Sequence, residues 1–339
     1  MDTNRLLLLA ASLACLAHLT GCSKSGGGEK ITGSPTDAPV ELTSQWRGSN
    51  RYTFHFEMAL ATETPRPNQP DPVHYETAVE EEYAVVVTNT IPDGSHGLEL
   101  EVLSLKLDTG DEDKYVLNFD SENPVMGNDG SPQAEALQKL IGARLRYRVG
   151  PDNSVLELDG LRALMDRISK ADERGLGQSF IRRTLGQEFF KRLVETPPLP
   201  SKPVRVGESW SALRNVSAGS REIVPVNLTC TFKGWQKLEN VRCALVEFTG
   251  DIQSSTNAPA NPPNRPRALL PNLEKGIVQG KVWFDPGWGF AKRTVSDQAF
   301  TMRAAARRSR TTNAPPSTVL VKVRQHHSIT LQEISPWSR

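Results

Sequence analysis

Residues 97–107 read Gly-Leu-Glu-Leu-Glu-Val-Leu-Ser-Leu-Lys-Leu, with apolar side chains at every second position over most of the run. This period of two is typical of a β-strand with one buried face and one face in water. The turn Pro92-Asp93-Gly94 separates this run from the apolar stretch Tyr83–Val87. Two such runs flanking a turn predict a β-hairpin. The stretch therefore indicates an antiparallel sheet.

The same pattern extends on both sides of this hairpin. Residues 51–58 alternate, with Tyr52, Phe54, Phe56 and Met58 on one face. Strand-like runs return after residue 200 and continue to the last expected strand, 318–331. Between them, helices are predicted at three places because apolar residues recur at helical spacing. These lie at 131–141, after an expected Ser131 cap, at 161–168, and at 176–194.

These elements predict an α+β protein of mostly antiparallel, curved sheets with a central helical segment. A diverged duplication into two half-barrel repeats would explain the similar element order of the two halves, although their residues differ, and a fold without repeats stays open. The proline cluster 197–200 is the expected domain boundary. We expect four parts: a leader (1–21), a flexible tether (22–39), and two β-rich lobes (40–196 and 197–339).

The charge balance excludes one class of partner. The 339 residues include 40 Lys and Arg against 39 Asp and Glu, a formal net charge of +1. Nucleic-acid-binding domains usually carry a basic face, so we expect no nucleic-acid partner. The hydrophobic fraction of 37% is enough to build a core.

The N-terminus predicts where the protein resides. An uncharged apolar run, 6–17, has the length of the central region of a signal peptide but is too short to span a bilayer. It is followed by Leu19-Thr20-Gly21-Cys22, which resembles the lipobox of bacterial lipoproteins. The alternatives are an ordinary cleaved signal peptide and a buried apolar helix.

The lipobox resemblance implies that Cys22 becomes the first residue of the mature chain and carries lipid. Several acyl chains would anchor it far more firmly than a single chain. A bacterial cell-envelope protein that is lipid-anchored and faces the periplasm is expected. Ser23, rather than Asp, after the cysteine is similar to the outer-membrane sorting pattern.

Export would place the chain where disulfides persist. Cys230 and Cys243 lie on two strand-like runs, 226–232 and 241–248, with a turn expected near 237–240. In that hairpin the two cysteines are offset by several residues, so a bridge would need a bulge or another register. A disulfide and a pair of buried thiols both remain open.

The body resembles an uncharacterised family of bacterial lipoproteins. The resemblance rests on Val206-Gly207-Glu208-Ser209-Trp210, Phe119-Asp120-Ser121 and Leu140-Ile141-Gly142, together with the N-terminal motif. At the level of the fold, the strand-turn-strand unit 283–295 is similar to units of lipoprotein-carrier-like half-barrels. The resemblance implies a curved antiparallel sheet with helices on its concave face. It offers no catalytic residue.

Catalytic chemistry is not predicted. An enzyme would show a nucleophile, a base or a metal set at a telling spacing, and we find no such motif. His326 and His327 are adjacent on an expected strand, so they should point to opposite faces and cannot hold one metal together. We expect no catalytic residues, no metal, no cofactor and no enzyme activity.

One aromatic cluster suggests a ligand. Trp283, Phe284, Trp288 and Phe290 lie within eight positions. In a curved sheet they could line an apolar cavity, whereas the alternative is a packed core under the turn. The leading functional hypothesis is a membrane-anchored lipoprotein with a non-enzymatic binding or envelope-scaffolding role, whose partner is an unknown envelope protein. The alternative is a protein that binds a lipid or an acyl chain in a half-barrel cavity.

Overall fold

The computed structural model describes residues 29–30, 38–65, 71–111, 114–123, 131–169, 176–218, 222–253, 272–305 and 318–337. Strands dominate this part of the chain. The strands are β1 (Glu29–Lys30), β2 (Asn50–Thr64), β3 (Val73–Thr90), β4 (His96–Asp111), β5 (Lys114–Asp120), β6 (Arg144–Val149), β7 (Val155–Asp159), β8 (Ser209–Ala218), β9 (Glu222–Leu238), β10 (Val241–Ile252), β11 (Asn272–Asp285), β12 (Phe290–Ala305) and β13 (Thr318–Pro336). The helices are α2 (Pro132–Gln138), α3 (Leu161–Ser169), α4 (Leu176–Thr184) and α5 (Gln187–Val194).

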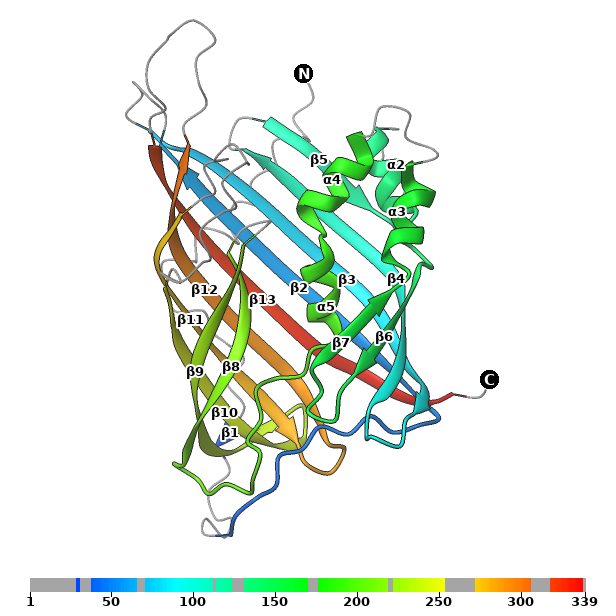
Figure 1. The fold of residues 1–339 in the computed structure, drawn as a ribbon, viewed down its shortest axis with the longest axis vertical. Coiled ribbons are helices and arrows are strands. Elements are labelled where there is room, and N and C mark those ends of the chain that lie inside the picture. Colours follow the sequence, from blue (N-terminus) through cyan, green and yellow to red (C-terminus); the bar gives the residue numbers. More distant parts are fainter. Residues whose placement is uncertain are drawn as a thin grey trace, which may run out of the picture.

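All described strands belong to one antiparallel sheet. Its order is β1-β9-β10-β11-β12-β13-β2-β3-β4-β6-β7, with β8 beside β9 and β5 beside β4. The sheet is curved (Figure 1). Among the described residues, β7 pairs only with β6 and β8 only with β9, so the sheet does not close on itself. The prediction of a curved antiparallel sheet is confirmed. The label α+β overstates the helices, which are few and short (Figure 1).

The predicted lobes are joined within this sheet. The last strand, β13, pairs with β12 on one side and with β2 on the other. Residues 40–196 and 197–339 therefore supply neighbouring parts of a single sheet rather than two separate sheets. β1 lies inside the predicted tether, where Glu29 pairs with Lys237 of β9. The chain thus joins the sheet before the expected end of the tether.

The first core lies between the helices and the sheet. Tyr52, Phe54, Phe56 and Met58 of β2 are all buried on one face, as their alternation predicts. They belong to one apolar cluster with the buried faces of β3, β4, β6 and the four helices. Figure 1 shows the helices on one side of the sheet, over β3 and β4. We call this side the concave face.

Two of the predicted helices are present, although α2 ends at Gln138, before the expected end at 141, and the third is divided. The hydroxyl of Ser131 accepts a hydrogen bond from the backbone of Ala134, which confirms the N-terminal cap of α2. The single helix expected over 176–194 is wrong. Gly186 has extended backbone (φ −74°, ψ −179°) and caps α5, so the segment forms α4 and α5 instead.

Two tyrosines hold α5 against the sheet. The hydroxyl of Tyr83 on β3 donates to the carbonyl of Leu193 (2.7 Å), and that of Tyr147 on β6 donates to the carbonyl of Phe190 (3.0 Å). Carbonyls in the last turn of a helix lack partners within the helix. The bond to Leu193 therefore satisfies a carbonyl at the end of α5, and both bonds fix the position of α5 above the sheet.

A second core fills the concave face of the other half. Its buried members come mainly from β8 to β13 and include Leu228, Phe248 and Val278. The hairpin of β9 and β10 turns at Glu239 and Asn240, which both have positive φ (49° and 68°). Such two-residue turns match the twist of the paired strands. The predicted hairpin over 226–248 is confirmed.

Candidate functional site

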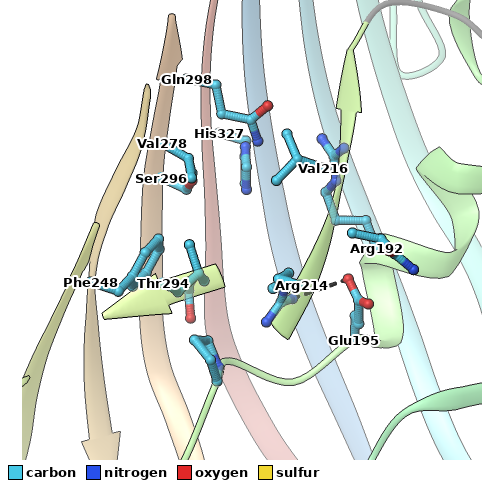
Figure 2. Close-up of a pocket in the computed structure, with 13 residues that line it drawn as sticks. Arg192, Glu195, Arg214, Val216, Phe248, Val278, Thr294, Ser296, Gln298 and His327 are labelled. Atoms are coloured by element: carbon cyan, nitrogen blue, oxygen red, sulfur yellow. Dashed lines mark hydrogen bonds and ion pairs between the residues drawn. The ribbon is translucent and has the colours of Figure 1, made fainter. Parts of the chain in front are cut away.

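A polar cavity lies on the concave face between the end of α5, β8 and the strands β9 to β13. Its volume is about 50 Å³. Because one water needs roughly 10–15 Å³ of such space, the cavity could hold a few waters or one small polar group. Figure 2 shows side chains entering it from the sheet, from β8 and from α5. The lining comprises Arg192, Glu195, Pro198, Arg214, Asn215, Val216, Leu228, Phe248, Val278, Thr294, Ser296, Gln298 and His327.

The floor of the cavity is polar because β12 carries polar residues at inward positions. Ser296 pairs directly with His327 of β13, and Gln298 follows on the same face. Only 5% of Gln298 and 8% of His327 remain exposed. Within the described part of the chain, Oε1 of Gln298 and Nδ1 of His327 have no hydrogen-bond partner. Buried polar atoms are normally paired, so both atoms can receive a ligand.

Two arginines form the opposite wall. Arg214 of β8 makes an ion pair with Glu195, just after α5 (3.1 Å), and donates to the carbonyl of Thr196 (2.7 Å). This contact joins the edge of the sheet to the helical layer (Figure 2). Arg192 of α5 donates no hydrogen bond to any described residue from its guanidinium group, although Glu195 lies near enough to favour its charge.

The local electrostatics keep the imidazole of His327 neutral. Burial lowers the pKa of His327 well below its usual value, and the positive charges of Arg192 and Arg214 lower it further. Burial and Arg214 also lower the pKa of Arg192, while Glu195 opposes this shift. Arginine is nonetheless charged at any physiological pH. The cavity therefore combines a neutral histidine with fixed positive charge.

The rest of the lining is apolar. Val216, Leu228, Phe248 and Val278 all belong to the second core. Phe248 pairs with Gly280 across β10 and β11. A Cβ atom on Gly280 would lie 2.3 Å from Cζ of Phe248, so glycine is needed for this ring to lie close to the strand.

The four aromatic residues 283, 284, 288 and 290 do not line one cavity, so that prediction is wrong. Trp283 belongs to a small outer cluster, Phe284 to the second core and Phe290 to the first. Trp288 is 46% exposed at the turn, with the guanidinium of Arg47 over its ring. Successive strand residues point to opposite faces, which separates Trp283 from Phe284. The alternative of a packed core is correct in part, because Phe284 and Phe290 are core residues but Trp288 is exposed.

Cys230 and Cys243 are both free and buried. In the hairpin register Cys230 pairs with Phe248 and Cys243 with Gln236, so they lie at different levels. They also belong to different clusters, on the two faces of the sheet. Of the two alternatives, the structure has the buried thiols. Burial raises the pKa of Cys230 to about 11 and that of Cys243 to about 12, which makes both poor nucleophiles.

The remaining sequence predictions concern the leader, the two adjacent histidines, metal binding and membrane-spanning helices. Cys22 and the leader 1–21 lie outside the described residues. His326 and His327 point to opposite faces, as predicted: His326 contacts Asp297 at 2.7 Å on the exposed side. In the described ranges, no three His, Cys, Asp or Glu side chains are grouped to hold a metal. No helix of the described chain has the length and apolar character to cross a membrane.

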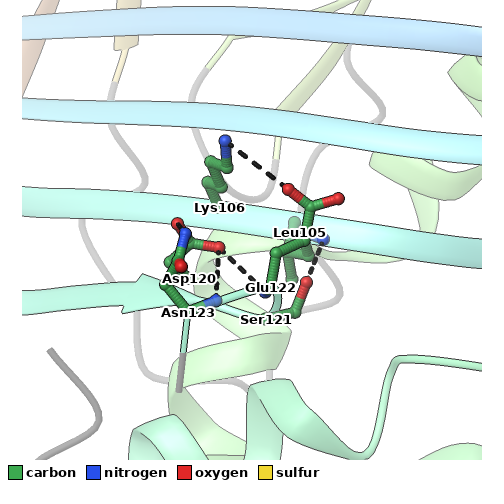
Figure 3. A network of polar contacts seen from close by, with 6 residues as sticks. All are labelled: Leu105, Lys106, Asp120, Ser121, Glu122 and Asn123. Atoms are coloured by element: carbon green, nitrogen blue, oxygen red, sulfur yellow. Dashed lines mark hydrogen bonds and ion pairs between the residues drawn. The ribbon is translucent and has the colours of Figure 1, made fainter. Parts of the chain in front are cut away.

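The motif Phe119-Asp120-Ser121 has a structural position at the end of β5. Phe119 is buried in the first core. The carboxylate of Asp120 accepts hydrogen bonds from Glu122 and Asn123, and the hydroxyl of Ser121 accepts one from the backbone of Leu105 (2.9 Å). Figure 3 shows this network beside β4, together with the ion pair of Lys106 and Glu122.

Sequence reasoning missed the polar cavity. A signal was present in residues 294–298, where Thr294, Ser296 and Gln298 recur at the spacing of one strand face. A buried strand with polar residues on its inner face indicates a polar interior. The contributions of Arg192 and Arg214 have no local signal, because they meet only when β8 folds against α5.

The fold and the cavity define a class: a protein built on one open, curved antiparallel sheet, with a polar cavity on the concave face. No protein-family model matches the chain, and no curated protein matches it in sequence.

Among solved structures, the chain is similar to lipovitellin, studied for its lipid–protein interactions, with a TM-score of 0.47 and 10% identity. That match covers 87% of this chain but only 26% of the lipovitellin chain. A second match is DynF from the dynemicin biosynthesis pathway of Micromonospora chersina, with a TM-score of 0.20 and 6% identity. It covers 91% of this chain and 92% of DynF. Neither likeness places the chain in a family.

Proposed function

We propose that this protein is a lipid-anchored, non-enzymatic protein of the bacterial cell envelope that binds a ligand inside its curved sheet. The anchor is Cys22, on the strength of the lipobox-like segment 19–22. The binding site is the cavity between α5, β8 and β9 to β13. The outer membrane, with the body facing the periplasm, is the proposed location.

The observation that carries the binding role is the pair of unpaired buried atoms in the cavity. Oε1 of Gln298 and Nδ1 of His327 have lost their contact with bulk water and have no protein partner in the described chain. Leaving a buried polar atom unpaired costs about 1–3 kcal/mol. A ligand that pairs with them would recover this free energy.

The apolar wall favours a ligand that carries an apolar portion, such as a lipid or an acyl chain. Val216, Leu228, Phe248 and Val278 present only carbon atoms to the cavity from their side chains. Ligand sites commonly combine such walls with a few polar groups that set orientation. At about 50 Å³, the cavity admits one end of an acyl-chain ligand.

The anchoring is tested with Cys22→Ser. We expect loss of palmitate labelling and loss of membrane fractionation, because the thioether cannot form. Cys15→Ser, which removes the cysteine inside the leader, is the matched control and should retain both. Membrane retention of the Cys22→Ser protein without label would contradict the lipid anchor.

The binding role is tested on full-length protein purified from membranes. Native mass spectrometry, followed by organic extraction, should find a small molecule bound to the wild type. Val216→Phe should fill the cavity and expel it. Leu213→Phe is the matched control, since Leu213 lies on the same strand but is 70% exposed. A wild type that carries no ligand, or a Val216→Phe variant that keeps it, would count against this site.

A further inference from the structure

We propose that the cavity binds an oxyanion, a carboxylate or phosphate group at the end of an amphipathic ligand, through Arg192, His327 and Gln298. This inference rests on the proposed binding function and adds the chemical class of the ligand. The charges, the hydrogen-bond donors and the size of the cavity all favour such a group.

The charges around the cavity do not cancel. Glu195 forms its ion pair with Arg214, and Glu188 is held by Lys191 at 3.0 Å. Arg192 makes no ion pair with a described residue, yet it lines the same cavity. One guanidinium group thus remains without a matching carboxylate. An incoming anion would supply the missing negative charge, whereas a cation would be repelled.

The other polar groups at the floor can all donate hydrogen bonds. A neutral imidazole carries one N–H, and the unpaired Nδ1 of His327 can bear it. The amide of Gln298 can present its NH₂ group by rotation, since its oxygen has no partner that fixes it. Ser296 adds a hydroxyl beside His327. Donors that surround a positive charge in this way are suited to an acceptor-rich oxyanion.

The dimensions limit what can enter. A volume of about 50 Å³ suits a single carboxylate or phosphate group rather than a large polar headgroup. The carbon atoms next to that group would then lie against Val216, Leu228, Phe248 and Val278, and the rest of the chain would extend out of the cavity. The site therefore selects an anion that carries an alkyl or acyl portion.

The test compares three ligands that share a six-carbon chain: hexanoate, hexyl phosphate and hexanol. Their binding to the full-length protein in lipid nanodiscs is measured by titration calorimetry, with empty nanodiscs as the blank. One of the two anions should bind about tenfold or more tightly than hexanol, since hydrogen bonds to charged groups are strong. Which anion binds more tightly distinguishes a carboxylate ligand from a phosphate ligand. Acetate and inorganic phosphate, which lack the chain, should bind more weakly than their six-carbon counterparts.

Arg192→Met should abolish the preference for the anion and leave hexanol binding within about threefold. Arg182→Met is the matched control, because Arg182 is exposed on α4 and does not line the cavity. If Arg192→Met does not fold, Gln298→Leu removes a floor group without changing charge and should also weaken anion binding.

The outcomes separate this inference from the proposed function. Hexanol that binds as tightly as both anions would overturn the oxyanion site but leave an apolar binding site in place. An anion preference that survives both Arg192→Met and Gln298→Leu would also overturn it. Acetate or inorganic phosphate binding as tightly as the six-carbon anions would overturn the amphipathic ligand. Failure of all the ligands to bind would count against the proposed function itself.

Discussion

Glu81 is a carboxylic acid held in an apolar environment. It lies on the concave face of β3, is 2% exposed, and pairs across the sheet with Phe56 and Leu105. Its Oε1 has no hydrogen-bond partner among the described residues. Burial raises the pKa of Glu81 from 4.5 to about 8. At neutral pH the folded protein therefore keeps this group protonated, while the unfolded chain releases the proton.

This difference predicts how stability depends on pH. Between pH 4.5 and about 8 the folded state binds one more proton at Glu81 than the unfolded state, so stability falls as pH rises. The slope from this group is roughly 1.4 kcal/mol per pH unit across that window. Glu81→Gln, which cannot ionise, should remove this slope and be more stable than wild type at pH 8. Chemical denaturation at pH 5, 6.5 and 8 measures the effect.

Glu80→Gln is the matched control, because Glu80 is the preceding residue on β3 but is exposed. It should keep the slope of the wild type. A Glu81→Gln variant that loses stability with rising pH as steeply as wild type would show that Glu81 is not the group responsible.

Single residues were predicted well where one strand face decides their position. The alternation of β2 placed Tyr52 and Phe54 correctly, because the strand is long and one face is buried. Alternation did not predict the position of Trp288, because this residue lies in a turn where the period of two ends. Alternation also did not place Glu81 in the interior, since three consecutive glutamates, 80–82, are ordinarily expected in contact with water.

At the scale of elements, the close packing of β10, β11 and β12 depends on a glycine at one inward position of β11. Gly280 lies between Phe248 and Ser296 in the pairing of β10, β11 and β12. A Cβ atom there would lie 2.2 Å from the carbonyl oxygen of Val295 and 2.3 Å from Cζ of Phe248. These distances are far below normal contact, so either the ring or the strand would have to move.

Gly280→Ala should therefore destabilise the protein by about 1–3 kcal/mol, the usual range for overpacking. It should also weaken ligand binding, because Phe248 lines the cavity. Gly48→Ala is the control, since no atom lies within 4 Å of the Cβ position there. Its effect should stay within about 0.5 kcal/mol. Thermal and chemical unfolding compare the two variants, and equal stability for both would exclude the steric explanation.

The elements themselves were largely predictable, but their ends and contacts were not. The caps and turns that are local in sequence, such as Ser131 and the residues 239–240, behaved as expected. Gly186 divided the expected helix because it allows α5 to begin anew and bring Phe189 and Phe190 into the first core. The hydroxyl contacts of Tyr83 and Tyr147 with α5 depend on residues more than 40 positions apart. A local sequence pattern cannot predict such contacts.

At the scale of the whole molecule, one pairing decides the architecture. β13 lies between β12 and β2, which joins the two predicted lobes into one sheet. The sequence contains both strands plainly, but their register follows from the burial of two long faces rather than from a turn between them. This is why the sequence predicted a curved antiparallel sheet but not its continuity, nor the cavity that forms where β8 meets α5.

The same architecture limits how a lipid anchor at Cys22 could orient the molecule. Seven residues lead from Cys22 to Glu29, and a fully extended chain of this length spans at most about 25 Å. Glu29 pairs with Lys237 near the end of β9. A strand of 17 residues is about 55 Å long. The anchor can therefore reach the end that carries the turns 239–240 and 286–289, but not the opposite end.

We therefore expect the end of the molecule with Trp288 to lie nearer the membrane than the end with Leu320. These side chains are equally exposed, at 46%, and lie at opposite ends of β12 and β13. A fluorophore attached to Trp288→Cys or to Leu320→Cys reports the distance, because Cys230 and Cys243 are buried and poorly reactive. In vesicles that contain a headgroup quencher, the label at 288 should be quenched more strongly than the label at 320. Equal quenching, or stronger quenching at 320, would mean that β1 does not hold the tethered segment beside β9 when the protein is anchored.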